Sequence, residues 1–488
     1  MRTAARADER VTVAVLAVAL ATFALLQSMV APLMPTLQRD LHTDQNTVTW
    51  LLTAYLLAAS VATPILGRLG DQYGKHRMLL VSLTALAAGA ALAAVANTVG
   101  VMIVARAIQG IGGGTMPIAF GIVRDERPPE RVAGTIGFLA ALLAAGGGLG
   151  TVVAGPLEKA LGVHWLFASA ALVIAAAIAV TVCFVPESPV RTPGRVGWVP
   201  AVLLSAALVC VLIGISSASR WGWSSGRVTS LVGGGLVLGL AWIRSERRSP
   251  HPLIDLRMMR RPAVWTTNLV SLAIGAAMYS TIAFLPQFLQ TAHDVGYGFG
   301  ASITESGLIL LPQSVIMFVA GSSTGAVIAR FGGRALMLVS CLLTAAAFAG
   351  LAVAHATVTE FVLSTLLMGA GMGLSFAGMT TIVIEAVPLE QTGAASGMNA
   401  NIRTMGGAVG TSLVSLLITA HVDPHTGAPR ESGYTLGFAA VAGLMVVGAA
   451  VALLIPRRGG PPDPAVVQHL EQAHPEVALV AAATVEPQ

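Results

Sequence analysis

Gly67-Arg-Leu-Gly-Asp71-Gln-Tyr-Gly74-Lys-His-Arg77 is a short, charged segment between two long apolar stretches. The stretch before it covers 48–66, and the stretch after it covers 78–97. Each has roughly the 20 apolar residues that a helix needs to cross a bilayer. Gly67 and Gly74 relieve the steric limits on a tight turn, because glycine has no Cβ atom. The segment therefore predicts the turn of a transmembrane helical hairpin.

The whole chain has the composition of a membrane protein. Of its 488 residues, 55% are hydrophobic and only 10% are charged, whereas a soluble domain has roughly 25% charged residues. A soluble fold of this size cannot bury so much apolar surface, but a bilayer can accept it. We therefore predict an all-α integral membrane protein with fourteen transmembrane helices. Their expected ranges are 11–36, 48–66, 78–97, 100–121, 132–155, 163–185, 199–216, 225–243, 263–289, 304–328, 335–354, 357–381, 396–420 and 434–455.

Basic residues gather on one side of the predicted helices. With a cytoplasmic N-terminus, 21 of the 28 Lys and Arg residues fall in cytoplasmic segments, five fall in outer loops, and Arg106 and Arg403 fall inside helices. This asymmetry is typical of multi-pass proteins of the plasma membrane, and it predicts cytoplasmic N- and C-termini. It also accounts for the net charge of +5 without a nucleic-acid partner. The first apolar stretch lacks a small-x-small cleavage site that is followed by polar residues, so we predict that it stays in the protein as a membrane helix.

An internal repeat relates the two ends of the chain. Aligning Gly67 with Gly325, an offset of 258 residues, places Gly74 on Gly332. The same offset, within one residue, aligns Gly110, Gly112 and Gly114 with Gly369, Gly371 and Gly373. Parallel repeats around a site at the middle of the membrane are a recurring plan of transporters. The sequence therefore predicts two homologous halves.

The offset is longer than six spanning helices need, so two further helices are expected between the halves. The short candidates at 199–216 and 225–243 fit that gap. The predicted organisation is an N-terminal six-helix bundle at 1–188, two extra central helices with a cytoplasmic linker at 189–262, a C-terminal six-helix bundle at 263–455, and a cytoplasmic tail at 456–488 that we expect to be disordered.

With these features the sequence resembles the major facilitator superfamily, and within it the fourteen-span drug:proton antiporter branch. The resemblance covers all fourteen predicted helices. Four motifs carry it: the loop Gly67–Arg77, the run Arg106-Ala-Ile-Gln109-Gly110, the segment Pro252-Leu-Ile-Asp-Leu-Arg257, and the stretch Val387–Gly407, which includes Gly393-Ala-Ala-Ser396-Gly397-Met-Asn399. It implies that two halves rock around a central cavity and exchange a substrate for protons.

The sequence departs from this branch at two places. Leu26 stands where the branch usually has an Asp in the first helix. The fifth helix reads Gly146-Gly-Gly-Leu-Gly-Thr151, followed by Gly155-Pro156, where the branch usually has Gly-Pro-x-Leu-Gly-Gly. Small residues let helices approach closely, and a Gly/Pro cluster lets one bend. The resemblance implies a rocking interface that limits proton leak, and plain tight packing is the alternative. The residues concerned are Gly146, Gly150, Gly155 and Pro156.

The loop Gly67–Arg77 is the strongest of the motifs. Asp71 can face the positive N-terminal end of a helix, and Arg77 can pair with an acid. The resemblance implies that Gly67, Asp71, Gly74 and Arg77 form a latch between the two halves in the outward-facing state, with its partner near 392–396. The alternative is a solvated loop that only follows the positive-inside pattern.

Arg106 lies inside the fourth predicted helix, where a permanent charge costs at least about 2.5–3.5 kcal/mol. It should therefore face a cavity or a partner, unless it extends to the outer headgroups. The resemblance implies a proton relay by Arg106 and Gln109. Glu305 at the outer end of the tenth helix is a second candidate for proton coupling, because burial can raise the pKa of a carboxyl group. Its alternative role is capping the helix that Thr304 opens.

Several polar residues inside predicted helices are candidates for the lining of a substrate cavity, although each alone is more often an interhelical hydrogen bond. They are Gln27, Asn268, Tyr279, Gln287, Gln313 and Asn399. Arg403 joins them as a candidate partner of an acid or of an anionic substrate group. His421, Asp423 and His425 form a weak metal pattern in an outer loop, and a solvated loop is the simpler interpretation.

These observations predict a secondary transporter that exports drugs, antibiotics or other small amphipathic compounds by alternating access, coupled to protons. The alternative is a transporter of one specific small metabolite. An enzyme should show paired acids or His and acid clusters at one membrane depth, a receptor should carry a folded soluble domain, and the sequence shows neither. It has no phosphate-binding Gly-Lys-Ser/Thr motif, so we expect neither ATP coupling nor a cofactor. The expected partners are a small-molecule substrate, protons and lipid, with the chain acting as a monomer.

Overall fold

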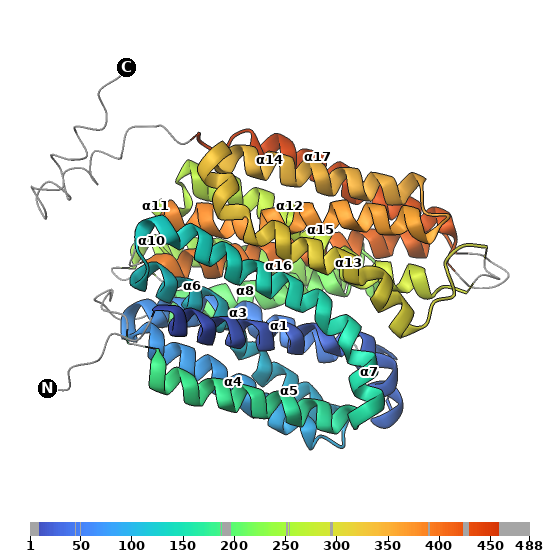
Figure 1. Cartoon of the computed structure of the whole chain (residues 1–488), viewed down its shortest axis with the longest axis horizontal. Helices are drawn as coiled ribbons and strands as arrows, with labels where there is room; N and C mark the ends of the chain where they lie inside the picture. The colour runs from blue at the N-terminus through green and yellow to red at the C-terminus, as the bar shows by residue number, and fades with distance from the viewer. Residues whose placement is uncertain are drawn as a thin grey trace, which may run out of the picture.

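The computed structural model describes residues 9–457 except 44, 49, 186, 188–196, 250–251, 253, 293–295, 389–390 and 423–428. Long helices run side by side in one bundle (Figure 1). In chain order they are α1 (Glu9–Asp40), α2 (Gln45–Val48), α3 (Trp50–Tyr73), α4 (Lys75–Ala94), α5 (Val99–Ile111), the 3₁₀ turn η1 (Gly112–Gly114), α6 (Thr115–Glu126), α7 (Pro129–Phe184), α8 (Trp198–Ser216), α9 (Ala218–Trp221), α10 (Gly226–Arg248), α11 (Leu256–Met259), α12 (Pro262–Gln290), α13 (Ile303–Ser322), α14 (Thr324–Val353), α15 (Val358–Glu385), α16 (Thr392–Ala420) and α17 (Glu431–Ala452).

Fourteen helical segments of the described chain are long and apolar enough to cross a membrane. The predicted all-α membrane fold with fourteen spans is therefore confirmed. The two weakest candidates, now α8 and α10, are among the fourteen. Of the predicted tail, only 456–457 belong to the described chain, and Asp423 and His425 of the weak metal pattern also lie outside it.

Glycines in left-handed backbone conformations make three of the turns between spans. α7 turns at Gly162 with φ 77°, and α14 turns at Gly332 with φ 81°. Gly74, between α3 and α4, has φ 113°. Side chains with a Cβ rarely adopt such angles. Gly74 and Gly332 are the pair that the repeat aligns, so both halves make the same turn with the same residue.

One predicted span is not continuous. The sequence predicts a tenth helix over 304–328, but α13 ends at Ser322 and the chain bends at Ser323 before α14 begins. The Ser323 hydroxyl donates to the carbonyl oxygen of Ala320, 2.7 Å away. A serine that bonds the preceding turn in this way often bends a helix. The span then continues to the turn at Gly332.

We call α1 to α7 the N-terminal group and α12 to α17 the C-terminal group. The groups meet along two seams, one between α7 and α13 and one between α3 and α16. α8 packs on both α3 and α16, and α10 packs on α8. The Ser412 hydroxyl of α16 donates to the carbonyl oxygen of Ile215 at 2.8 Å. The extra helices therefore cover the outside of the α3–α16 seam.

The α7 seam is tight over a long distance. A Cβ added at Gly325 would lie 2.9 Å from the Cα of Gly134, and one added at Gly307 would lie 3.1 Å from the Cα of Val152. These contacts lie in different halves of the first limb of α7, which runs from Pro129 to the Gly162 turn. Small residues therefore let the two groups approach backbone to backbone along this limb.

The close approaches across the α3–α16 seam fall in the half of α3 next to the Gly74 turn. A Cβ at Gly67 would lie 2.5 Å from the carbonyl oxygen of Gly393, and a Cβ at Gly397 would lie 3.1 Å from the Cα of Pro64. The helix ends and turns at this end carry the basic residues Lys75, Arg77, Arg124 and Arg127. We call it the basic end, and here the two groups are closed against each other.

Candidate functional site

Asp71 lies at the N-terminus of α16, inside the closed contact at the basic end. One carboxylate oxygen, Oδ2, accepts a hydrogen bond from the backbone N–H of Ala394 at 3.3 Å. The side chain is only 1% exposed. A carboxylate at a helix N-terminus is stabilised by the unpaired N–H groups and by the helix dipole. The structure thus brings Asp71 and Gly67 to the segment that the sequence singled out at 392–396.

Two further charges complete the surroundings of Asp71. The ammonium group of Lys75 is 2.6 Å from Oδ2 of Asp125 and 3.6 Å from Oδ1 of Asp71. All three side chains are buried. Breaking a buried ion pair leaves an uncompensated charge, so such a set is sensitive to the loss of one member. The sequence analysis treated Lys75 as a loop charge and did not consider Asp125.

Arg124 is the cation that reaches from the N-terminal group to the C-terminal group. Its Nη1 donates to Oγ1 of Thr392 at 2.6 Å, and its Nη2 donates to the carbonyl oxygen of Val387 at 2.7 Å. Val387 follows the end of α15, where carbonyl oxygens lack helical partners. Arg261 similarly donates to the carbonyl oxygen of Ala386 at 2.7 Å. Two arginines therefore hold the end of α15, and one of them spans both groups.

Arg77 pairs with an acid, as expected, but that acid lies outside the segment at 392–396. Its side chain is 68% exposed, and its Nε lies 3.8 Å from Oε2 of Glu187 in the N-terminal group. Glu187 also accepts a hydrogen bond from the N–H of His76 at 3.2 Å. Arg124, which the sequence analysis did not single out, reaches Thr392 in the segment expected to hold the partner of the latch.

We predict different results for removing these two arginines. Arg124→Gln loses charged hydrogen bonds, each of which contributes about 1.5–3 kcal/mol, so transport should fall by roughly tenfold or more. Arg77→Gln removes an exposed ion pair of about 0–1 kcal/mol and should transport like the wild type. Initial rates in vesicles with matched amounts of folded protein measure both. Equal losses in the two variants would show that the choice between the two arginines is wrong.

Arg106 is buried in the N-terminal group with no exposed surface. Its Nε donates to the carbonyl oxygen of Leu51 at 3.2 Å, its Nη1 donates to Oε1 of Gln109, and its guanidinium lies 4.3 Å from the ring centre of Tyr55. The alternative that Arg106 extends to the headgroups is therefore wrong. Three polar atoms of this cluster, Arg106 Nη2, Gln109 Nε2 and the Tyr55 hydroxyl, have no hydrogen-bond partner among the described residues.

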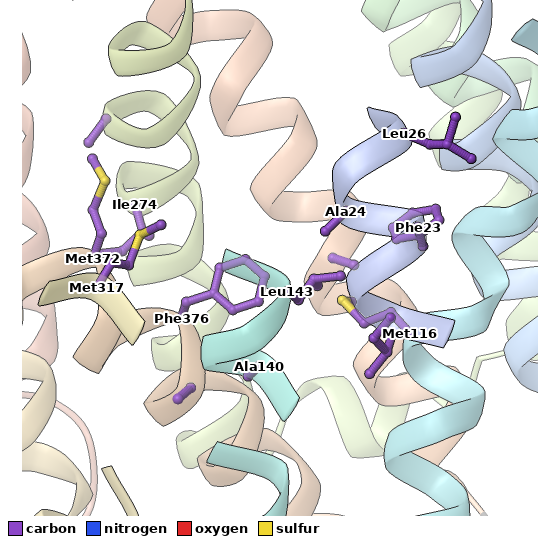
Figure 2. Packing of buried hydrophobic residues seen from close by; sticks show 14 of the residues in the cluster. Phe23, Ala24, Leu26, Met116, Ala140, Leu143, Ile274, Met317, Met372 and Phe376 are labelled. Carbon is purple, nitrogen blue, oxygen red and sulfur yellow. The ribbon is translucent and has the colours of Figure 1, made fainter. Parts of the chain in front are cut away.

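Arg403 on α16 is a second cation buried near the middle of a span. It is 6% exposed, and its guanidinium lies 4.2 Å from the ring centre of Phe376 on α15. Its Nη2 is 3.8 Å from the sulfur of Met116 on α6, which belongs to the other group. In the described chain its Nη1 has no hydrogen-bond partner. Figure 2 shows Phe376 and Met116 among the apolar side chains of this region, with Leu143 between them.

The other candidates for the cavity lining are buried, half-buried or exposed. Asn399 donates to Oδ1 of Asn268 at 2.8 Å and to the hydroxyl of Ser271 at 2.7 Å, so these residues join α16 to α12. Tyr279 is half-buried and packs against Gly407. Gln27 is half-buried and Gln313 is buried, whereas Gln287 is exposed near the end of α12, away from the basic end.

Glu305 is exposed at the start of α13, and not in the buried position that the proton-coupling interpretation required. Its carboxylate accepts a hydrogen bond from the N–H of Ser302 at 2.8 Å, and its own N–H donates to the Ser302 hydroxyl at 3.2 Å. This is a capping box at the exposed start of α13. A capping box satisfies two free N–H groups at once. Glu305 therefore has the helix-capping position that the sequence analysis held as its alternative.

Comparison with known proteins identifies the family to which the chain belongs. The sequence matches the Major Facilitator Superfamily over residues 16–411 and 294–479. The chain belongs to the Major Facilitator Superfamily. It is a multi-pass membrane transporter, and the resemblance drawn from its motifs is confirmed.

Named members of the superfamily are similar along most of the chain. The tetracenomycin C resistance and export protein of Streptomyces glaucescens is 29% identical over 84% of this chain and 76% of its own length. The multidrug efflux pump LfrA of Mycolicibacterium smegmatis is 27% identical over 91% of this chain and 89% of its own. Among solved structures, the proton:xylose symporter XylE superposes with a TM-score of 0.64 at 14% identity, over 92% of this chain and 96% of that one, which shows the shared fold.

In this member of the superfamily, the glycines of α7 contact two different helices. A Cβ at Gly146 would lie 2.9 Å from the Cβ of Ala24, and Gly150 lies against Ser28, both on α1. Gly148 lies against Ser314 of α13 in the C-terminal group. Gly155 is buried and Pro156 is exposed. The glycine run therefore serves both packing within the N-terminal group and the seam between the groups.

Proposed function

We propose that this transporter exports antibiotics or other small amphipathic drugs from the cell in exchange for protons. The named relatives support this class of substrate, because they are resistance, export and efflux proteins. The basic end then faces the cytoplasm, as the charge asymmetry of the sequence indicates. In this proposal a monomer spans the plasma membrane as two six-helix halves and two extra helices, with the substrate and protons as its partners.

The observation that carries this proposal is the closed contact at the basic end. Gly67 meets Gly393 there, and Arg124 reaches Thr392 and Val387 of the C-terminal group. The α7 seam supplies a smooth contact of small residues around which the groups can turn. If the basic end opened while the opposite end of the bundle closed, the space between the groups would face the two sides of the membrane in turn, which is alternating access.

Asp71 is the group that we propose to couple this opening to a proton. A proton on its carboxylate removes the charge that faces the N-terminus of α16 and ends its attraction to Lys75. Lys75 stays paired, because its closer partner at 2.6 Å is Asp125. Protonation therefore weakens the contact between the groups without leaving a buried cation unpaired.

Arg106 has a different part in the proposal from the one that its motif implied. A guanidinium keeps its proton in proteins, so Arg106 does not hand a proton on. It holds Gln109 and Tyr55 in place instead, through one hydrogen bond and one cation–π contact.

The test of the function uses inverted membrane vesicles with a dye that reports the pH gradient. A panel of cationic, neutral and anionic compounds is added to vesicles with and without the folded protein. A compound that collapses the gradient only when the protein is present supports drug:proton antiport. If no compound in the panel moves protons or accumulates, export loses its support and transport of a specific metabolite becomes the better proposal.

Asp71→Asn is predicted to uncouple the transporter. Asn keeps the shape of the side chain but has no charge to face the helix terminus, a contact that contributes up to about 2 kcal/mol. We expect compound-dependent proton movement to fall by roughly tenfold or more. Glu305→Gln removes a carboxylate at the opposite end of the bundle and is the matched control, with movement expected at the wild-type level. Normal coupling in Asp71→Asn would rule out Asp71 as the coupling group.

A further inference from the structure

At the middle of the spans the described chain has buried cations but no acids. Arg106 is buried inside the N-terminal group, and Arg403 is buried where the two groups face each other. Across the described residues, every Asp and Glu within a spanning helix lies near an end or a turn, as Asp71, Glu158 and Glu246 do. Neither arginine has an ion pair with a carboxylate among the described residues. A buried charge without a counter-charge is expensive, and in a membrane it usually marks a functional position.

Arg403 is the better placed of the two cations for a ligand that passes between the groups. Its guanidinium is in contact with Phe376 from α15 and with Met116 from α6, so it lies where the C-terminal group faces the N-terminal group. The methionine sulfur is only a weak acceptor. Nη1 donates to no described residue. The cation thus has an aromatic face on one side and unused donor capacity on its edge.

The unused polar atoms around this region are mainly donors. Besides Arg403 Nη1, they include Arg106 Nη2, Gln109 Nε2 and the Tyr55 hydroxyl, none of which has a hydrogen-bond partner in the described chain. Tyr279 of α12 packs against Gly407, which lies one turn after Arg403 on α16. A ligand with acceptor oxygens would satisfy these donors, whereas a cationic ligand would add a further unpaired positive charge.

Apolar side chains supply the rest of the surroundings. Met116, Met317, Met372 and Phe376 are buried in one cluster with Leu143 (Figure 2). Methionine side chains adapt to different apolar shapes and make favourable contacts with aromatic rings. The cluster therefore suits a planar aromatic body rather than a small polar solute.

We propose that the transported compound is an aromatic anion and that Arg403 binds its ionised oxygen. This inference rests on the proposed export function and names the chemical class of its substrate. The ring of the substrate packs on the methionines and Phe376, and the carboxylate or phenolate group pairs with Nη1 of Arg403.

The experiment compares two aromatic dyes of opposite charge, 5-carboxyfluorescein and ethidium. Fluorescence anisotropy measures the Kd of each dye for the purified full chain, and inverted vesicles measure its transport. The wild type should bind and accumulate carboxyfluorescein in preference to ethidium. Arg403→Gln should raise the Kd for carboxyfluorescein by roughly tenfold or more, since a charged hydrogen bond is lost. Arg403→Lys should recover part of the affinity, and Arg330→Gln, at an exposed position, should change nothing.

Each contrary outcome has its own meaning. Preference for ethidium, or an unchanged Kd for carboxyfluorescein in folded Arg403→Gln, overturns the anion proposal and leaves the export function standing. Failure of both dyes, together with proton movement by a neutral compound from the panel, overturns it as well. Failure of both dyes and of the whole panel overturns the export function itself.

Discussion

Gly67→Val is expected to abolish transport by keeping the basic end from closing. Even a single Cβ at this position would lie 2.5 Å from the carbonyl oxygen of Gly393 and 2.9 Å from its carbonyl carbon, and both are backbone atoms that cannot rotate away. Overpacking of this kind costs about 1–3 kcal/mol, which changes the population of a closed state by roughly 5- to 150-fold. The measurement is the initial rate of drug accumulation in inverted vesicles.

The accessibility of α16 to a thiol reagent distinguishes a variant that is trapped in one conformation from a variant that is misfolded. Ser396 is buried within the closed contact. In a chain whose Cys183, Cys210 and Cys341 are replaced by Ser, a Ser396→Cys thiol should react slowly with a membrane-impermeant maleimide applied from the basic side. Adding Gly67→Val should make it react faster. Gly147→Val is the control, because a Cβ there meets no atom within 4 Å. Slow labelling and normal transport in Gly67→Val would contradict the closed contact as a moving gate.

The spans were predictable because a bilayer imposes one simple requirement on each. A helix must offer about 20 apolar residues, so composition and length place every span. The turn at Gly332 was predictable by alignment with Gly74. The bend at Ser323 was not, since it depends on a hydrogen bond of one serine hydroxyl to the preceding turn, and serine occurs in straight helices as well.

A functional residue was predictable from the sequence only where its type and position leave few explanations other than a role in function. Burial of Arg106 followed from the cost of a charge inside a span. By contrast, Arg124 could not be singled out, because it lies at a helix end where the positive-inside pattern already explains a basic residue. The pairing of Asn399 with Asn268 joins residues 131 positions apart. Such a pair depends on how α12 and α16 pack, which no local pattern in the sequence reveals.

Arg106→Lys is the second change expected to have a large effect, although it keeps the charge. Arg106 donates to Leu51 with Nε and to Gln109 with Nη1 while its plane lies over Tyr55. A lysine ammonium is a compact, strongly hydrated point charge on a flexible stem and cannot reproduce this planar fork. It leaves at least one buried acceptor unsatisfied, at about 1–3 kcal/mol. We therefore expect transport to fall by roughly tenfold or more.

The control for this change is an arginine that also lies over an aromatic ring but at the surface. Arg227 lies 6.0 Å from the ring centre of Trp221 and is exposed, so Arg227→Lys should transport at the wild-type rate. A comparison of Arg106→Lys with Arg106→Gln then separates charge from geometry. Equal losses in the two variants mean that the fork, rather than the positive charge, holds Gln109 and Tyr55 in place. Retention of transport by Arg106→Lys alone would mean that charge is sufficient, and the positioning role proposed for Arg106 would be wrong.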